Sequence, residues 1–257
     1  MPGEGFVRFN LHNSLCCFPA SLEVLKPLVD ISEEALREYL LEIDRIQNER
    51  VVRLQATYTK EIEKLKGKKV LFLGDSITND NLGYRESVSR AADVESINGS
   101  ISGGTSSMLV PLAKHLIEKR PDVVSLMIGA NDSISLEKES FHQVSLEEYE
   151  RNVDTILGWA KQIGAKILLF EITPVLEDRF KLCFAKEQQL QSNAAIQGYN
   201  LILQRLSRKH QIELLAHPWL AEGAVRESLY ESDGIHLNVK GQALFAENWI
   251  TSAARLL

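Results

Sequence analysis

From residue 68 onward, the hydrophobic positions alternate between two patterns. Short apolar runs bounded by Gly, Pro or Lys are typical of strands buried on both faces of a sheet, and they occur at 70–73, 94–97, 123–128, 166–171 and 212–215. Between and after them, apolar residues recur at helical spacing, at 108–119, 146–163, 192–210 and 239–257. This alternation predicts βαβ units and an α/β fold, in which helices cover both faces of a parallel sheet of about five strands.

The first 66 residues follow a different pattern. Residues 1–30 mix prolines and glycines with scattered apolar positions, so we expect them to be mostly irregular. Residues 32–66 contain neither Gly nor Pro, and Ser32 followed by two glutamates is typical of a capped helix start. We therefore divide the chain into an irregular and helical N-terminal extension, residues 1–66, and a main domain, residues 67–257.

The predicted helix over residues 32–66 carries two apolar stripes with an interruption at 47–50. Their members are Leu36, Leu40 and Ile43, then Leu54, Tyr58, Ile62 and Leu65. One interpretation is a long helix through which the protein forms a homo-oligomer. The other is two helices packed on the main domain of the same chain. Fewer than three clean heptads argue against a coiled coil, and both interpretations stay open.

Composition narrows the classes of function. A hydrophobic content of 44% and a charged content of 25% are ordinary for a soluble globular protein. A net charge of −6 argues against nucleic acid as the main partner, because phosphate binding requires a basic surface. No apolar run is long enough to span a membrane, and the N-terminus does not resemble a signal peptide. Three cysteines (Cys16, Cys17 and Cys183) without a C-x-x-C pair fit reduced thiols in the cytoplasm.

The first predicted strand ends in a polar turn, Gly74-Asp75-Ser76. Glycine permits the sharp change of direction that a strand needs before a helix. Functional groups gather beyond the carboxyl ends of parallel strands, and a helix N-terminus there is suited to bind an anion. Ser76 is therefore placed as a nucleophile whose reaction generates an oxyanion. Helix capping by Asp75 or Ser76 would explain the same tripeptide, which by itself is common.

Three further polar stretches are expected on the same side of the sheet. Ser102-Gly103 follows the second strand, Gly129-Ala130-Asn131-Asp132 follows the third, and Asp233-Gly234-Ile235-His236 precedes the last helix. A nucleophilic hydroxyl needs a base, a group that orients the base, and donors for the oxyanion. His236, Asp233, Gly103 and Asn131 can fill these roles. Each residue alone could instead be a cap or a loop residue, but together they would require four coincidences on one face.

These four stretches resemble, in order, the signature blocks of the SGNH (GDSL-type) hydrolase superfamily, from about residue 68 to the C-terminus. The resemblance implies a flavodoxin-like, doubly wound parallel sheet. It implies Ser76 as the nucleophile, His236 as the base and Asp233 as the residue that orients the base. The implied oxyanion hole consists of the backbone N–H groups of Ser76 and Gly103 and the side-chain amide of Asn131.

On this basis the expected function is a cofactor-independent serine esterase acting on a small-molecule ester, with a short acyl group such as acetyl on a carbohydrate as the favoured substrate. Acyl transfer to an alcohol, lysophospholipase or thioesterase activity, and a non-catalytic binding module are the alternatives. Because all four blocks follow residue 66, a chain lacking residues 1–66 is expected to keep a chemically competent Ser76.

Other features of the sequence add little chemistry. No metal-binding His spacing, G-x-S-x-G elbow, P-loop or G-x-G-x-x-G occurs, so neither a metal nor a nucleotide is implied. His115 and His210 are expected to be solvated, and His217 to be structural. The long connections 133–145 and 173–191 are expected near the site, where Phe180, Cys183 and Phe184 could form an apolar wall.

Overall fold

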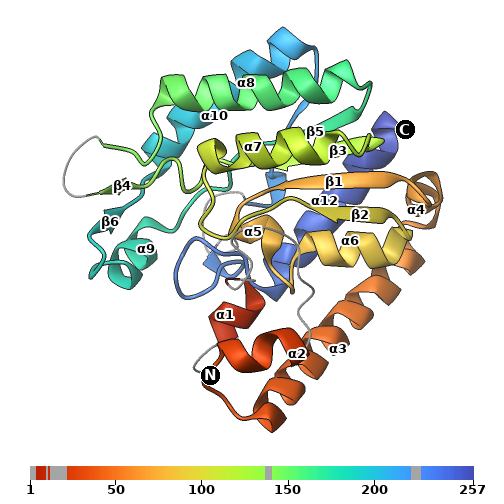
Figure 1. The fold of residues 1–257 in the computed structure, drawn as a ribbon, viewed down its shortest axis with the longest axis vertical. Helices are drawn as coiled ribbons and strands as arrows, with labels where there is room; N and C mark the ends of the chain where they lie inside the picture. The colour runs from red at the N-terminus through yellow and green to blue at the C-terminus, as the bar shows by residue number, and fades with distance from the viewer. Residues whose placement is uncertain (1–3, 10, 12–21, 137–140, 221–226) are drawn as a thin grey trace.

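The computed structural model describes residues 4–9, 11, 22–136, 141–220 and 227–257 (Figure 1). At its centre, a five-stranded sheet has the order β2-β1-β3-β5-β7, and each neighbouring pair of strands is parallel. The strands are β1 (Lys69–Gly74), β2 (Glu95–Asn98), β3 (Val123–Met127), β5 (Lys166–Phe170) and β7 (Leu214–Leu215). The predicted α/β fold with a parallel sheet of about five strands is confirmed. The strand order reverses between β1 and β3, which is where doubly wound sheets place their ligands.

The residues of β1 explain why its sequence is apolar without alternation. Leu71 and Leu73 pack into the hydrophobic core on one face of the sheet, and Val70 and Phe72 pack into the core on the other face. All four side chains are completely buried. A strand with only one buried face would show a polar residue at every second position.

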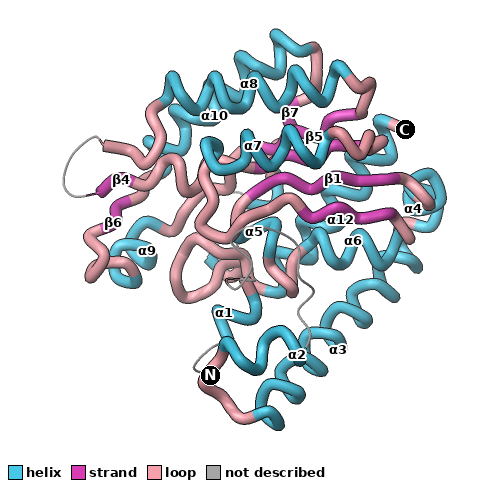
Figure 2. The backbone as a smooth tube through the Cα atoms, viewed as in Figure 1, coloured by secondary structure: helices cyan, strands magenta, loops and turns pink. Residues whose placement is uncertain are grey.

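Helices form a layer on each face of the sheet (Figure 2). The first face is covered by α7 (Ser106–Ile117), α8 (Leu146–Gln162) and α10 (Asn193–His210). The second is covered by α6 (Tyr84–Ala92) and α12 (Val239–Leu256). Four of these helices match the predicted ones to within about two residues at either end. The helix α6 was not predicted, because most of its residues are polar and its large buried apolar side chains are only Tyr84 and Val88.

The helix predicted over residues 32–66 is two helices, α3 (Glu33–Thr57) and α4 (Thr59–Leu65), with a break at Tyr58. The Ser32 hydroxyl caps α3 by accepting a hydrogen bond from the N–H of Ala35, as expected. Leu54 and Leu65 are buried in the core beneath α6 and α12. The described structure thus shows these helices packed on the main domain; association of chains through this helical region stays a prediction.

The interruption of the apolar stripe at residues 47–50 has a structural role. Gln47 and Arg50 are buried and reach the turn that follows the Ser76 helix. The amide of Gln47 donates to the carbonyl oxygen of Asn81, and the guanidinium of Arg50 donates to that of Leu82, each at 2.7 Å. The polar positions therefore tie α3 to the loop beside the predicted nucleophile.

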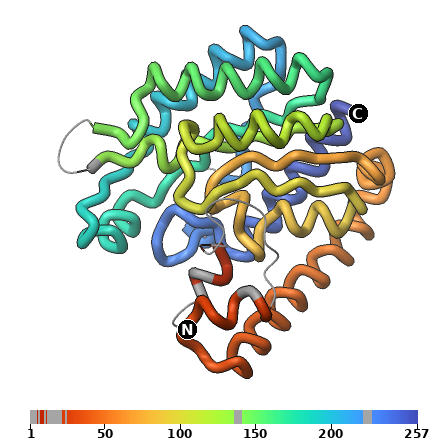
Figure 3. Tube along the Cα trace, viewed as in Figure 1, coloured from red at the N-terminus to blue at the C-terminus, as the bar shows by residue number. Residues whose placement is uncertain are grey.

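Part of the expectation for residues 1–30 is wrong. Among the described residues of that stretch, α1 (Glu4–Arg8), α2 (Leu22–Leu25) and a 3-10 turn, η1 (Lys26–Leu28), are helical. Val7 and Leu25 are completely buried in a small separate core that includes Leu36 of α3 and Leu82 of the main domain. Burial against α3, which local sequence pattern does not reveal, supplies the stability of these short helices. Figure 3 shows this N-terminal segment beside the chain that precedes α12.

The two long connections meet in a short antiparallel pair, β4 (Ser135–Leu136) with β6 (Gln189–Leu190), and the second connection also contains α9 (Glu177–Cys183). A further 3-10 turn, η2 (Pro218–Leu220), follows β7. Among the described residues, no helix has both the length and the apolar character needed to cross a membrane. Cys183 is an exposed free thiol, whereas Cys16 and Cys17 lie outside the described residues.

Candidate active site

The turn that carries Ser76 is built by its neighbours. Gly74 ends β1 where a Cβ atom would lie 2.3 Å from the hydroxyl oxygen of Thr78 and 2.7 Å from the carbonyl oxygen of Met127, so only glycine fits. The Asp75 carboxylate caps the short helix α5 (Ser76–Asn79) by accepting the N–H of Ile77 at 3.0 Å. Ser76 is therefore the first residue of that helix, and it is half-buried. The alternative interpretation of Asp75 as a cap is correct, and it leaves the Ser76 hydroxyl available.

The structure brings Ser76, His236 and Asp233 into one chain of hydrogen bonds. The Ser76 hydroxyl oxygen lies 2.7 Å from Nε2 of His236, and Nδ1 of the same imidazole lies 2.7 Å from Oδ2 of Asp233. The other carboxylate oxygen, Oδ1, accepts the backbone N–H groups of Ile235 and His236 at 3.0 Å. Gly234 has φ +77°, and this left-handed residue lets the loop close on itself so that Asp233 faces His236.

The electrostatics fix the direction of these hydrogen bonds. Burial would raise the pKa of Asp233, but the hydrogen bond and charge of His236 and the two backbone donors together lower it. The carboxylate is therefore ionised at neutral pH and can only accept. Nδ1 of His236 must then carry the proton, which leaves Nε2 as the acceptor for the Ser76 hydroxyl.

Gly103 and Asn131 lie on the same side of the sheet as Ser76, beyond β2 and β3. Gly103 is exposed and has φ +72°. Only glycine fits at the next position, Gly104, because a Cβ atom there would lie 2.7 Å from the carbonyl oxygen of Ile101. The amide of Asn131 donates to the carbonyl oxygen of Gly104 at 3.0 Å. An amide has two N–H donors, so the second one is left for a ligand.

These predicted residues meet at a cavity of about 330 Å³. Ser76, His236, Gly103 and Asn131 all line it. Apolar side chains from the two long connections complete the wall, namely Ile134, Phe180 and Phe184. Two residues of the predicted apolar wall are thus in place, whereas Cys183 is absent from the described lining. The cavity can hold a small molecule with one reactive carbonyl near Ser76 and an apolar group beside it.

Phe9 and Leu11 also line this cavity, and no pattern or motif in the sequence pointed to either residue. The Phe9 ring stacks on the imidazole of His236 with 4.1 Å between ring centroids. Both residues belong to the stretch whose prolines and glycines predicted irregular structure. The contact joins the N-terminal extension to the main domain, although the division of the chain at residue 66 stays a prediction.

Two further carboxyl groups, those of Asp75 and Asp132, are buried next to the site residues Ser76 and Asn131. Burial raises the pKa of Asp75 to about 7 and that of Asp132 to about 6. Both oxygens of the Asp132 carboxyl accept the backbone N–H of Ser106, at 3.0 and 3.1 Å, which ties the turn after β3 to the start of α7. Neither carboxyl lines the cavity, so their roles are structural.

Replacing Asp75 by asparagine is expected to stabilise the protein at alkaline pH. The folded-state pKa of about 7 exceeds the ordinary value of 3.8, so the native state binds a proton that the unfolded chain has already released. Stability therefore falls as pH rises from about 4 to about 7. Asparagine keeps the capping oxygen without the charge.

The urea midpoint of Asp75→Asn should exceed that of the parent at pH 8, and the gain should shrink at pH 4. Equal midpoints of variant and parent at both pH values would contradict this. Asp30→Asn controls for the lost charge, because Asp30 is exposed and lies outside the helices.

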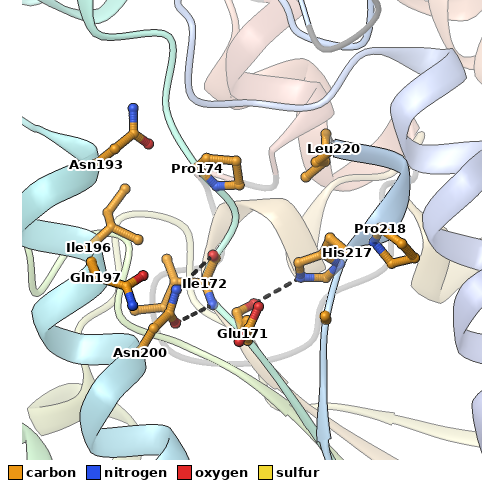
Figure 4. Close-up of a pocket in the computed structure, with 11 residues that line it drawn as sticks. Glu171, Ile172, Pro174, Asn193, Ile196, Gln197, Asn200, His217, Pro218 and Leu220 are labelled. Atoms are coloured by element: carbon orange, nitrogen blue, oxygen red, sulfur yellow. Dashed lines mark hydrogen bonds between the residues drawn. The ribbon is translucent and has the colours of Figure 1, made fainter. Parts of the chain in front are cut away.

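A second cavity, of about 350 Å³, lies at the carboxyl ends of β5 and β7 (Figure 4). Its polar groups are largely engaged in holding the backbone: the Asn200 amide bonds to both backbone groups of Ile172, and Nε2 of His217 donates to the carbonyl oxygen of Glu171 at 2.8 Å. Burial lowers the pKa of His217 to about 4, so the ring is neutral. These contacts agree with a structural role for His217.

His115 and His210 are not among the described residues that line either of these cavities. His115 is exposed, as expected. The expectation for His210 is wrong: its side chain is only 12% exposed, and Nε2 lies 2.7 Å from a carboxylate oxygen of Asp154. Within the described residues, no three His, Cys, Asp or Glu side chains are grouped as a metal site would require.

A protein-family model and a named relative each match most of this chain. Residues 72–244 match the model of the GDSL-like lipase/acylhydrolase family. A human protein named isoamyl acetate-hydrolyzing esterase 1 homolog is 26% identical over 199 residues, which are 70% of this chain and 79% of the relative.

Solved structures share the fold. A GDSL-like lipase from Bacteroides thetaiotaomicron has a TM-score of 0.60 at 20% identity, covering 78% of this chain and 97% of that one. The acetyl xylan esterase AlAXEase has a TM-score of 0.56 at 21% identity, covering 72% of this chain and 98% of that one. The family match begins at residue 72, so the N-terminal extension lies outside it.

Proposed function

The chain belongs to the GDSL-like lipase/acylhydrolase family of the SGNH hydrolase superfamily and is a serine hydrolase, and from this we propose that it hydrolyses a carboxylic ester through an acyl-enzyme on Ser76. The observation that carries the proposal is the pair of 2.7 Å contacts linking Ser76, His236 and Asp233 at the wall of a cavity. A base within hydrogen-bond reach of a hydroxyl, itself oriented by a carboxylate, is the arrangement that activates serine.

In the acylation step, Nε2 of His236 takes the proton from Ser76 while the serine oxygen attacks the ester carbonyl carbon. The carbonyl oxygen becomes an oxyanion, held by the backbone N–H groups of Ser76 and Gly103 and by the second amide hydrogen of Asn131. The imidazolium then gives its proton to the leaving alcohol oxygen as the carbon–oxygen bond breaks. Ionised Asp233 stabilises the imidazolium that forms between these two proton transfers.

In the deacylation step, water takes the place of the alcohol. His236 removes a proton from the water as its oxygen attacks the acyl carbon, and it returns that proton to Ser76 when the acid leaves. The same donors hold the second oxyanion. All groups required by this sequence come from side chains and backbone of the chain, so we expect no cofactor or metal to be needed.

Short acyl groups are the favoured substrates. A cavity of about 330 Å³ bounded by Phe180 and Phe184 suits a small ester better than a long acyl chain. Acetate esters occur in the names of two similar proteins, the isoamyl acetate-hydrolyzing esterase homolog and the acetyl xylan esterase. We therefore propose an acetyl ester, of a carbohydrate or of a small alcohol, as the substrate.

A substrate screen tests this proposal. Purified protein would be given p-nitrophenyl esters of increasing acyl length, acetylated sugars and simple alkyl acetates, with products identified by mass. We expect the highest kcat/KM on acetyl esters. Preference for long acyl chains would instead indicate a lysophospholipase or thioesterase, and transfer of acetyl to added sugar in preference to water would indicate an acyltransferase.

Replacing Asn131 by alanine is expected to lower kcat by about 10²–10³ with little change in KM, because one donor to the oxyanion is lost. The variant also loses the contact with the Gly104 carbonyl oxygen, so its melting temperature should be measured beside its kinetics. An effect confined to KM in a stably folded variant would show that Asn131 only positions the substrate.

Cell location and assembly belong to the same proposal. We expect a cytoplasmic protein, which fractionation of its cells would test. Sedimentation of the purified protein would show whether it forms a homo-oligomer, for which exposed α3 residues such as Leu41 and Val52 are available.

A further inference from the structure

The aromatic ring of Phe9 covers one face of the imidazole of His236. The two ring centroids are 4.1 Å apart and the ring planes differ by 29°. Such a contact removes water from that face of the imidazole and restricts its rotation. In the proposed reaction His236 must keep Nε2 aimed at Ser76, so a residue that limits the tilt of its ring bears on the chemistry.

The backbone of Phe9 is bonded to the loop that carries Gly103. Its carbonyl oxygen accepts hydrogen bonds from the Ser102 hydroxyl and, at 3.3 Å, from the side-chain amide of Asn79. Asn79 also donates to the Ser102 hydroxyl oxygen at 3.2 Å. Ser102 immediately precedes Gly103, and Asn79 ends the helix that begins at Ser76. Phe9 is therefore held by two of the three segments that form the proposed oxyanion hole, the Ser76 helix and the Gly103 loop.

Arg8 anchors the segment from the other side. Its guanidinium donates to the buried Asp80 carboxylate at 2.9 and 3.1 Å, to Glu231 at 2.5 Å, and to the carbonyl oxygen of Leu237 at 3.0 Å. Asp80 follows the Ser76 helix, whereas Glu231 and Leu237 flank the loop of Asp233 and His236. Although burial opposes the charged form, the two carboxylates raise the pKa of Arg8, so it stays ionised. Multiple charge-assisted bonds of this kind hold a segment firmly.

The side chain of Phe9 also forms part of the cavity wall. It lines the cavity together with Ser76 and Gly103. The leaving alcohol oxygen must receive its proton from Nε2 of His236, so the alcohol part of the ester lies beside that imidazole. A ring stacked on the imidazole then borders the alcohol part, while Phe180 and Phe184 remain to border the rest of the substrate.

We propose that Phe9, fixed by Arg8 and by the Ser102 loop, is a positioning residue for His236 and a specificity-determining residue for the alcohol part of the ester. This inference rests on the proposed esterase function. It assigns a role in the active site to a segment outside the family match, and it predicts that the wall on the alcohol side is set by the N-terminal extension.

Phe9→Ala and Phe9→Tyr test the proposal, with Leu28→Ala as the matched control. Leu28 belongs to the same N-terminal region, is 51% exposed and is absent from the described cavity lining. One substrate series keeps the acetyl group and lengthens the alcohol from ethyl to butyl to hexyl. A second keeps p-nitrophenol and lengthens the acyl group.

Phe9→Ala is expected to lower kcat on ethyl acetate roughly 10–100-fold, because the imidazole loses its support. The ratio of kcat/KM for hexyl acetate to that for ethyl acetate should rise about tenfold, since space opens on the alcohol side. Phe9→Tyr should restore most of the kcat, and Leu28→Ala should match the parent in both series. The acyl-length preference should stay the same in all variants.

The proposal is overturned if Phe9→Ala keeps the parent's kcat and alcohol preference, or if the acyl-length preference changes while the alcohol preference does not. Failure of the esterase function itself would look different, because the parent would then hydrolyse no ester in either series. In that case, the rate at which a fluorophosphonate labels Ser76 replaces kcat: slower labelling of Phe9→Ala, restored in Phe9→Tyr, supports the positioning role, and equal rates overturn it.

Discussion

Replacing Ser76 by alanine is expected to lower ester turnover by at least about 10⁴-fold, to the level left by binding and the oxyanion donors alone. The hydroxyl supplies the atom that attacks the substrate, and no other side chain of the described cavity lining is both nucleophilic and bonded to His236. Turnover would be measured on the best acetyl ester found in the substrate screen.

The fold should survive this change, because Ser76 is half-buried and its hydroxyl bonds only to the imidazole in the described structure. An unchanged melting curve would confirm this. Ser107→Ala provides the matched control, since Ser107 is a half-buried serine in the first turn of another helix and is absent from the described cavity lining. Retention of the parent's turnover by Ser76→Ala would show that another residue is the nucleophile.

Replacing Asp233 by asparagine is expected to lower kcat by about 10³–10⁴-fold. The carboxylate only accepts hydrogen bonds, which keeps the proton of the imidazole on Nδ1 and leaves Nε2 able to accept the Ser76 proton. An asparagine amide that donates to Nδ1 instead would place the proton on Nε2 and block this transfer. It would also give no charge to stabilise the imidazolium.

The two backbone contacts of Oδ1 can be kept by the asparagine oxygen, so the loop should retain its shape. Steady-state kinetics across pH 6–9, with circular dichroism as the check on folding, would measure the effect. A kcat within a few-fold of the parent's would mean that Asp233 merely shapes the loop.

The parallel sheet was predictable because a strand that is buried on both faces has a continuous run of apolar residues in the sequence. Leu71 and Leu73 face one core, and Val70 and Phe72 face the other, so β1 is continuously apolar. Three candidate site residues could be proposed from their position after a strand or before a helix, near a glycine such as Gly74 or Gly234. They are Ser76, Asn131 and Asp233.

The contribution of the N-terminal segment could not be predicted from local pattern. Phe9 lies against His236 beside Arg8, whose guanidinium pairs with Asp80 and Glu231, which lie 72 and 223 residues away in the chain. Long-range ion pairs of this kind leave no periodicity in the sequence. The short helices before residue 30 depend in the same way on burial against α3, as Val7 shows.

The most direct test of an acyl-enzyme on Ser76 is covalent trapping with a fluorophosphonate, followed by mass mapping of the labelled peptide. The proposed mechanism predicts one label for each chain, located on Ser76, with loss of ester hydrolysis in proportion to labelling. Prior saturation with a slowly hydrolysed ester should protect the site. Label on a different residue, or full ester hydrolysis by protein whose Ser76 is completely labelled, would contradict the mechanism.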